Sequence, residues 1–252
     1  TVLLVLAFFS TEEVIKPPAQ QQLDWRDSMQ AVFANGPLMI VIGLFTLGML
    51  SFTVRQTVAI YYFTYNIGRP DLIGLFFGLG LAVMFVGLPF VPALAARFDK
   101  AGAIQIGALF TIASSVGFYL TPASDYEWTI FWGCLVALGG APVAVLGWAM
   151  IPDTVEYAQW KHGKRADGAV YASASFFQKL GKAVGGAGVA LALSAAGYVA
   201  NQEQTPDTLE AIKQMLTCVP IVLMSLAFVL ARFYILDNAL HARIREELKS
   251  SD

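Results

Sequence analysis

The sequence has 252 residues, of which 57% are hydrophobic and only 13% are charged, and its mean hydropathy is +0.62. Soluble domains carry about 25% charged residues, so this chain has too few charges to cover a surface that faces water, and it is predicted to be embedded in lipid. The net charge of −2 gives no indication of a nucleic-acid partner, and with only two cysteines and two histidines no metal site is predicted.

The chain opens with an apolar run over residues 1–9, TVLLVLAFF. This run is about half the roughly 20 residues that a helix needs to cross a bilayer. It lacks the basic start and the small-residue cleavage site of a signal peptide. We interpret it as the end of a transmembrane helix whose beginning lies outside this sequence. Residues 10–36 are polar, with two adjacent prolines and a run of three glutamines, and predict a cytoplasmic middle loop.

Six apolar segments follow, and each is long enough to cross a hydrocarbon core of about 30 Å at 1.5 Å per residue. Backbone polar groups inside a bilayer must find partners within the segment, which predicts helices. The predicted fold class is an all-α membrane protein with a six-helix bundle over residues 37–236 and a cytoplasmic tail over residues 237–252. The six segments comprise residues 37–64, 72–95, 102–121, 128–151, 170–197 and 214–236.

The lysines and arginines of the connections indicate the orientation of the bundle. Connections on one side of the predicted bundle hold only Arg69 and Lys213. Because basic residues accumulate on the inner side, the richer connections are predicted to be cytoplasmic, in the cell inner (plasma) membrane. These richer connections are the middle loop, the turn at 97–100, the loop at 153–169 and the tail. Their ten basic residues are Lys16, Arg26, Arg97, Lys100, Lys161, Lys164, Arg165, Arg243, Arg245 and Lys249.

Two features of the first segment have more than one interpretation. Arg55 lies in its outer half and either pairs at the outer surface, stacks on an aromatic ring or lines a cavity. Tyr61, Tyr62 and Tyr65 follow at its outer end. They are typical of an interfacial aromatic belt. They also fit a platform for a sugar, since aromatic faces and phenol hydroxyls suit a polyhydroxylated ligand.

Two lysines occur inside the fifth segment. Lys179 and Lys182 are three residues apart, so both are expected on one face of a helix. An uncompensated lysine at that depth costs about 2.5–3.5 kcal/mol. The two amines therefore either extend to the headgroup region or face water, a partner or a substrate.

The stretch over residues 153–171, DTVEYAQWKHGKRADGAVY, gathers acids and bases between two apolar segments. A solvated loop is the ordinary interpretation of such a charge run. However, Asp153 and Glu156 share a helix face and are placed for ion pairs with Arg165 or with bases elsewhere. Ion pairs that form in one state and break in another would make a gate, in which Asp167 is a further candidate.

The sequence continues from this stretch as ASASFFQKLGKAVGG, and the fifth apolar segment ends at a Gly-Tyr pair. The combined pattern resembles the glycoside–pentoside–hexuronide:cation symporters, the melibiose-carrier family within the major facilitator superfamily. The resemblance spans essentially the whole chain. It implies helices seven to twelve of such a transporter, preceded by the end of helix six and the middle loop, so that the bundle is the C-terminal half.

The resemblance also implies roles for particular residues in substrate binding. Lys179 matches a lysine at the sugar and cation pocket, and Ser175 matches a hydroxyl-bearing position one turn earlier. Tyr62 is a third candidate for this pocket. The tryptophan that the melibiose carrier has in helix ten falls at Ala144 here, and Trp148, one turn away, is the candidate substitute.

The resemblance assigns Asp153, Glu156 and Arg165 to closure of the cytoplasmic side. It implies cation-coupled symport of a glycoside, pentoside or hexuronide by alternating access, with an N-terminal six-helix bundle and the lipid bilayer as partners. No cofactor is expected, and the main ligands of the coupling cation (Na⁺, H⁺ or Li⁺) are expected in the N-terminal half. The alternative is a structural membrane fragment that does not transport by itself. No nucleophile–base pair or phosphate loop predicts an enzyme.

Overall fold

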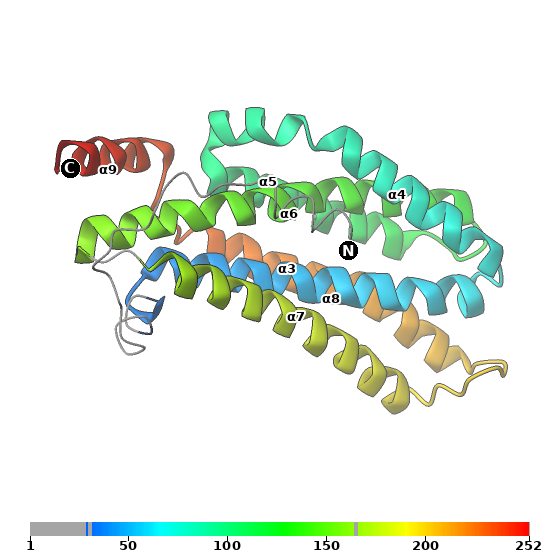
Figure 1. Ribbon diagram of the computed structural model, residues 1–252. Helices are drawn as coiled ribbons and strands as arrows, with labels where there is room; N and C mark the ends of the chain where they lie inside the picture. Colours follow the sequence, from blue (N-terminus) through cyan, green and yellow to red (C-terminus); the bar gives the residue numbers. More distant parts are fainter. Residues whose placement is uncertain (1–28, 30–31, 164–165, 252) are drawn as a thin grey trace, which may run out of the picture.

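The computed structural model describes residues 29, 32–163 and 166–251 (Figure 1). The predicted helix end at residues 1–9, most of the predicted loop at 10–36, and Arg165 lie outside the described residues. The described residues form seven α-helices and no strand. The elements are α3 (Gly36–Tyr61), the π-helical turn η1 (Tyr62–Asn66), the 3₁₀ turn η2 (Pro70–Leu72), α4 (Ile73–Gly87), α5 (Phe90–Leu120), α6 (Tyr126–His162), α7 (Asp167–Ala195), α8 (Pro206–Ala231) and α9 (Asn238–Ser251).

The helices confirm an all-α, multi-pass membrane protein. Within the described residues five stretches are long and apolar enough to cross a membrane, and α7 is not one of them because Lys179 and Lys182 interrupt it. Asp99 has a non-helical backbone with φ of 61° and divides α5 into two helical segments. The first segment continues from α4 toward one end of the bundle, and the second returns along the bundle (Figure 1). The predicted number of six spans therefore stays a prediction. The five stretches are Gly36–Asn66, Pro70–Gly87, Phe90–Leu120, Tyr126–Lys161 and Pro206–Ala231.

The stretch predicted as a loop over residues 153–169 is helical for more than half of its length. α6 continues without interruption to His162. Residues 153–162 contain neither glycine nor proline, so nothing in the backbone chemistry ends the helix there. Gly163, with φ of 66°, adopts the left-handed conformation that commonly ends a helix. The charges of Asp153 and Glu156 are therefore held on a rigid helix.

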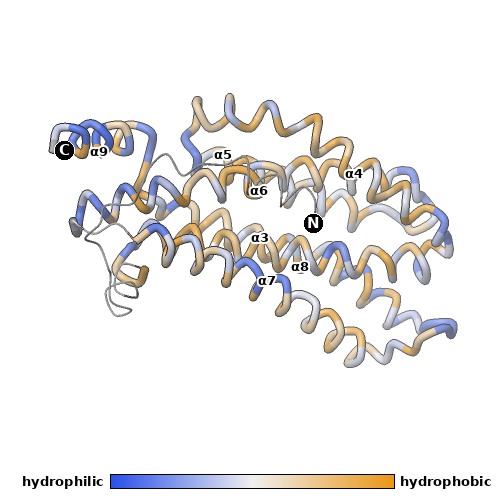
Figure 2. The backbone as a smooth tube through the Cα atoms, viewed as in Figure 1, coloured by the Kyte–Doolittle hydropathy of each residue, from blue (hydrophilic) through white to orange (hydrophobic). Residues whose placement is uncertain are grey.

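The long helices pack as one bundle with two apolar clusters. α3 lies against α7 and α8, α5 lies against α6 and α8, and α4 lies against α6 (Figure 1). One cluster contains Phe45, Ile104 and Met150, and the other contains Tyr62 and Phe118. Figure 2 shows hydrophobic residues along most of the helices, hydrophilic residues at their ends, and a hydrophilic stretch midway along α7. This stretch of α7 places charged side chains within the apolar bundle, as Arg55 does in α3.

Small residues bring α3 and α7 into backbone contact. A methyl group added to Gly181 would lie 2.7 Å from the carbonyl oxygen of Thr46, and one added to Gly185 would lie 3.2 Å from that of Leu50. Any larger side chain at these glycines would push the helices apart. The contact places the polar part of α7 directly beside the middle of α3.

Candidate functional site

A cavity of about 330 Å³ lies in the middle of the bundle. All six long helices contribute to its wall, and most of the lining residues are apolar. A mostly apolar cavity with a few polar groups is the usual form of a small-molecule site. The polar side chains that line it are Ser51 and Arg55 from α3, Thr111 from α5, and Gln178 and Lys182 from α7.

Arg55 is the most constrained of these polar residues. Its side chain reaches from α3 toward α6, where Nη1 donates a hydrogen bond to the Gly133 carbonyl oxygen at 3.2 Å. Guanidinium carries five N–H donors. In the described part of the chain that carbonyl is the one hydrogen-bond acceptor that Arg55 reaches. The remaining donors are available to the cavity.

Side chains of the hydrophilic stretch of α7 face two ways, some lining the cavity and one lying exposed at the surface of the described chain. Gln178 and Lys182 both line the cavity, and they are four residues apart and therefore on one helix face. Lys179 is exposed and is not among the lining residues. Successive residues are about 100° apart around a helix, so Lys179 and Lys182 point about 60° apart. Only one of the two predicted lysines is thus directed into the cavity.

The other residues predicted to bind substrate also lie outside the cavity wall. Ser175 is half-buried on α7. Tyr62 is fully buried and packs edge-on against Phe118, with ring centroids 5.5 Å apart. Trp148 is 40% exposed and packs against Phe45. Substrate contact by Lys179, Ser175, Tyr62 and Trp148 therefore stays a prediction that no contact in the described structure tests.

Sequence reasoning missed three polar residues of the cavity. Thr111 is buried, and its Oγ1 has no hydrogen-bond partner among the described residues. Ser51 and Gln178 line the same space. The spacing of Gln178 from Lys182 is the one signal that could have identified it. Single hydroxyl residues in apolar helices are common, so Ser51 and Thr111 carry no such signal.

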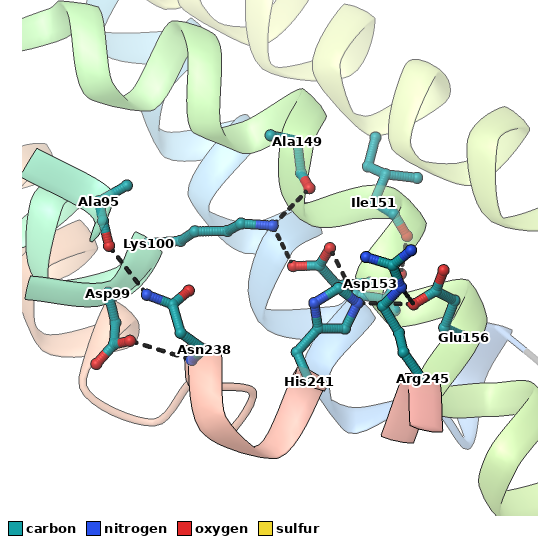
Figure 3. Close-up of polar contacts among 11 residues, drawn as sticks. Ala95, Asp99, Lys100, Ala149, Ile151, Asp153, Glu156, Asn238, His241 and Arg245 are labelled. Carbon is teal, nitrogen blue, oxygen red and sulfur yellow. Dashed lines mark hydrogen bonds and ion pairs between the residues drawn. The ribbon is translucent and has the colours of Figure 1, made fainter. Parts of the chain in front are cut away.

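A second group of charged residues lies at one end of the bundle. Asp153 of α6 is almost fully buried and lies between Lys100 and His241 (Figure 3). Lys100 Nζ is 2.5 Å from Asp153 Oδ2 and 3.1 Å from the Ala149 carbonyl oxygen. His241 Nε2 is 3.5 Å from Asp153 Oδ1. The aspartate therefore joins α5, α6 and α9.

The helix α9 is fastened to this charged end by further contacts. His241 Nε2 is 2.7 Å from Glu156 Oε2, and Arg245 Nε is 4.0 Å from the same oxygen (Figure 3). At the start of α9, the Asn238 backbone N–H donates to Asp99 Oδ1 at 3.0 Å. Much of the predicted tail over residues 237–252 is thus a helix docked on the bundle.

The far part of α9 also contacts α6. Trp160 Nε1 donates a hydrogen bond to Glu247 Oε2 at 2.7 Å, and Arg243 Nε donates to Glu247 Oε1 at 2.7 Å. The hydrogen bond from Trp160, followed by that from Arg243, holds the pKa of Glu247 below its ordinary value.

The third predicted gate acid, after Asp153 and Glu156, is Asp167. It lies half-buried in the first turn of α7.

The helices and the central cavity define a multi-pass membrane protein with a mostly apolar cavity lined by a few polar side chains. In the described residues no three histidine, cysteine or acidic side chains come together that could hold a metal ion. The sequence pattern of the family described as MFS/sugar transport protein matches residues 1–238. The chain therefore belongs to this family of the major facilitator superfamily, which consists of transporters rather than enzymes.

Individual relatives agree with this membership. The chain is 32% identical over 251 residues to the uncharacterized symporter YnaJ of Bacillus subtilis, covering 99% of this chain and 54% of the relative. It is 35% identical to the glucuronide carrier protein homolog of Escherichia coli, covering 94% and 52%. It is 32% identical to the isoprimeverose transporter of Lactiplantibacillus pentosus, covering 94% and 50%. The chain thus spans about half the length of the curated relatives it matches.

Proposed function

We propose that this chain is the C-terminal half of a cation-coupled sugar symporter that works by alternating access. The observation that carries the proposal is the cavity, which gathers Arg55, Thr111, Gln178 and Lys182 midway along helices that are otherwise apolar. Polar residues at such depth are costly and typically mark a transport pathway. The N-terminal six-helix bundle of the same transporter would close the other side of the cavity.

The charged end of the bundle serves as the inner gate in this proposal. Asp153 and Glu156 hold Lys100, His241 and Arg245 together in the described arrangement. Opening toward the cytoplasm would separate α9 and the Asp99 turn from α6, and these pairs would break. Arg165 and Asp167 would supply further charges to the same gate.

The names of the relatives support sugars as the substrate class. A glucuronide and isoprimeverose are the substrates named for two of them. The cavity fits such molecules, because Ser51, Thr111 and Gln178 offer hydrogen bonds to hydroxyl groups. A gradient of Na⁺, H⁺ or Li⁺ would drive uptake through the intact carrier.

Uptake by the full-length protein that contains this chain tests the proposal. Reconstituted vesicles are given a panel of labelled sugars with an imposed Na⁺, H⁺ or Li⁺ gradient or with none. We expect accumulation of at least one sugar under one gradient only. Equal uptake with and without every gradient would contradict cation coupling, and no flux of any sugar would contradict transport.

The same vesicles test the half-module part of the proposal. Residues 1–252 reconstituted alone are expected to give no flux, since the cavity then lacks its second wall. Flux through this chain alone would show that it is a complete carrier. If the full-length protein also gives none, the alternative of a structural membrane module is favoured.

A further inference from the structure

The central cavity contains two cationic side chains. Arg55 and Lys182 line it from α3 and α7, the two helices that come into close contact at Gly181 and Gly185. The guanidinium of Arg55 is half-buried and is hydrogen-bonded to a neutral carbonyl group. A charge in an apolar site is stabilised when a counter-charge binds close to it.

No protein carboxylate supplies that counter-charge among the described residues that line the cavity. The Asp and Glu side chains that form ion pairs in the described structure lie at the bundle ends, as Asp153 and Glu156 do. The cavity wall formed by this chain therefore carries an uncompensated positive charge. The rest of the wall is largely apolar, which strengthens the attraction for an anion.

We propose that the cavity selects a substrate carrying an oxyanion, such as a carboxylate or a sulfonate, with Arg55 as the main contact and Lys182 as the second. This inference rests on the proposed function and specifies its substrate class. Arg55 presents a planar fork of N–H donors that matches two oxygens of one anionic group, while the Lys182 ammonium acts as a point charge.

The neutral polar groups complete a site for a polyhydroxylated anion. Thr111 has a buried hydroxyl with no partner in the described part of the chain, and Gln178 lies one turn from Lys182. Both can bond to hydroxyl groups without regard to charge. Their contribution is therefore expected to be equal for a charged sugar and for its neutral counterpart.

Binding of two matched probes tests the inference. The full-length protein is placed in phosphatidylcholine nanodiscs, so that no anionic lipid headgroup competes, and is titrated calorimetrically with phenyl glucuronide and phenyl glucoside. These compounds differ by a carboxylate against a hydroxymethyl group. We expect the glucuronide to bind about 10- to 100-fold more tightly, as suits charge-assisted hydrogen bonds.

Substitutions assign the preference to the cavity. Arg55→Gln is expected to weaken glucuronide binding by about 10- to 100-fold and to change glucoside binding by less than about twofold. Lys182→Gln is expected to have a smaller effect in the same direction, and it carries the test if Arg55→Gln is not monodisperse. Arg232→Gln and Lys213→Gln remove cations that do not line the cavity and are expected to leave both affinities unchanged.

Four results distinguish the failure of this inference from the failure of the proposed function. Equal affinity for the two probes overturns the oxyanion inference, as does an equal loss of both in Arg55→Gln. Gradient-driven uptake of neutral sugars alone overturns the inference and leaves symport standing. Selective glucuronide binding that is lost in Arg55→Gln, without uptake of any sugar, supports the oxyanion site and overturns transport.

Discussion

Lys100 and Asp153 form the closest ion pair at the charged end of the bundle, with Nζ 2.5 Å from Oδ2 and only 6% of the aspartate side chain exposed. The pair connects the helical segment that follows Asp99 to the last turns of α6. Removing either partner leaves the other in surroundings that exclude most water, so the loss exceeds that of an exposed pair.

We expect Lys100→Ala to lower the free energy of unfolding by about 1–3 kcal/mol. Because Asp153→Ala removes the same contact, the double variant should lose clearly less than the sum of the two single variants. Unfolding in mixed micelles measures all three. Arg97→Ala is the control, since Arg97 is exposed and lies over the ring of Phe98. Additive losses in the double variant would mean that the pair contributes no coupling.

Acid should loosen the contact between α9 and α6 at Trp160. The hydrogen bond from Trp160 lowers the pKa of Glu247, so the ionised carboxylate is favoured when α9 is docked. A carboxyl group whose pKa is lowered by docking stabilises the docked state at pH values above its ordinary pKa. This stabilisation is lost as the pH falls through the lowered pKa. The contact should therefore be intact at neutral pH and weaken below the ordinary value of 4.5.

The fluorescence of Trp160 measures this transition when the other tryptophans are replaced by phenylalanine. We expect the emission to change as the pH falls below the ordinary glutamate pKa. In Glu247→Gln the amide does not titrate, so the acid transition should disappear. A transition that persists unchanged in this variant would assign it to another group.

Asn35 should stabilise the protein through two separate hydrogen bonds. Its Oδ1 accepts from the Leu38 backbone N–H at 3.2 Å and caps α3, while its Nδ2 donates to the Thr154 carbonyl oxygen at 2.8 Å. Asn35→Ala is expected to cost about 2–4 kcal/mol, because the cap and a fully buried bond are both lost. Asn35→Ser keeps a capping oxygen and should cost roughly half as much. Equal losses would indicate that the cap contributes little.

The backbone contact between α3 and α7 should tolerate no side chain at Gly181. We expect Gly181→Ala to destabilise by about 1–3 kcal/mol, because the added methyl group meets the Thr46 carbonyl oxygen. Gly188→Ala on the same helix meets no atom within 4 Å and should be neutral or slightly stabilising. The melting temperatures of the two purified variants, compared with that of the unchanged protein, measure these changes in stability. A similar melting temperature for both variants would show that the helices separate easily.

Sequence reasoning located the helices well, because apolar length is a property of consecutive residues. It was less successful at boundaries that depend on the context of the whole chain. The segment predicted to end at residue 151 continues to His162, since the charges after Pro152 are stabilised by α5 and α9. The predicted turn at residues 97–100 includes Asp99, which has a left-handed backbone although it is not a glycine.

The candidate site was only partly predictable for the same reason. Arg55 and Lys182 stood out as charges inside apolar segments, and both line the cavity. The rotation of α7 was not available from spacing alone, so Lys179 and Lys182 could not be distinguished until the packing of Gly181 on α3 fixed the orientation. The pairing of Asp153 with Lys100 and His241 joins residues that are 53 and 88 positions apart, and no local pattern could have revealed it.

The touching backbones at Gly181 and Thr46 have a consequence for motion. Helices separated by long side chains can slide as those side chains change rotamer. Two backbones in direct contact have no intervening side chains that can rearrange in this way. We therefore expect α3 and α7 to travel as one rigid pair, with hinges located elsewhere in the bundle. The distance between the backbone positions of Arg55 and Lys182 would then stay constant, whichever side of the membrane their cavity faces.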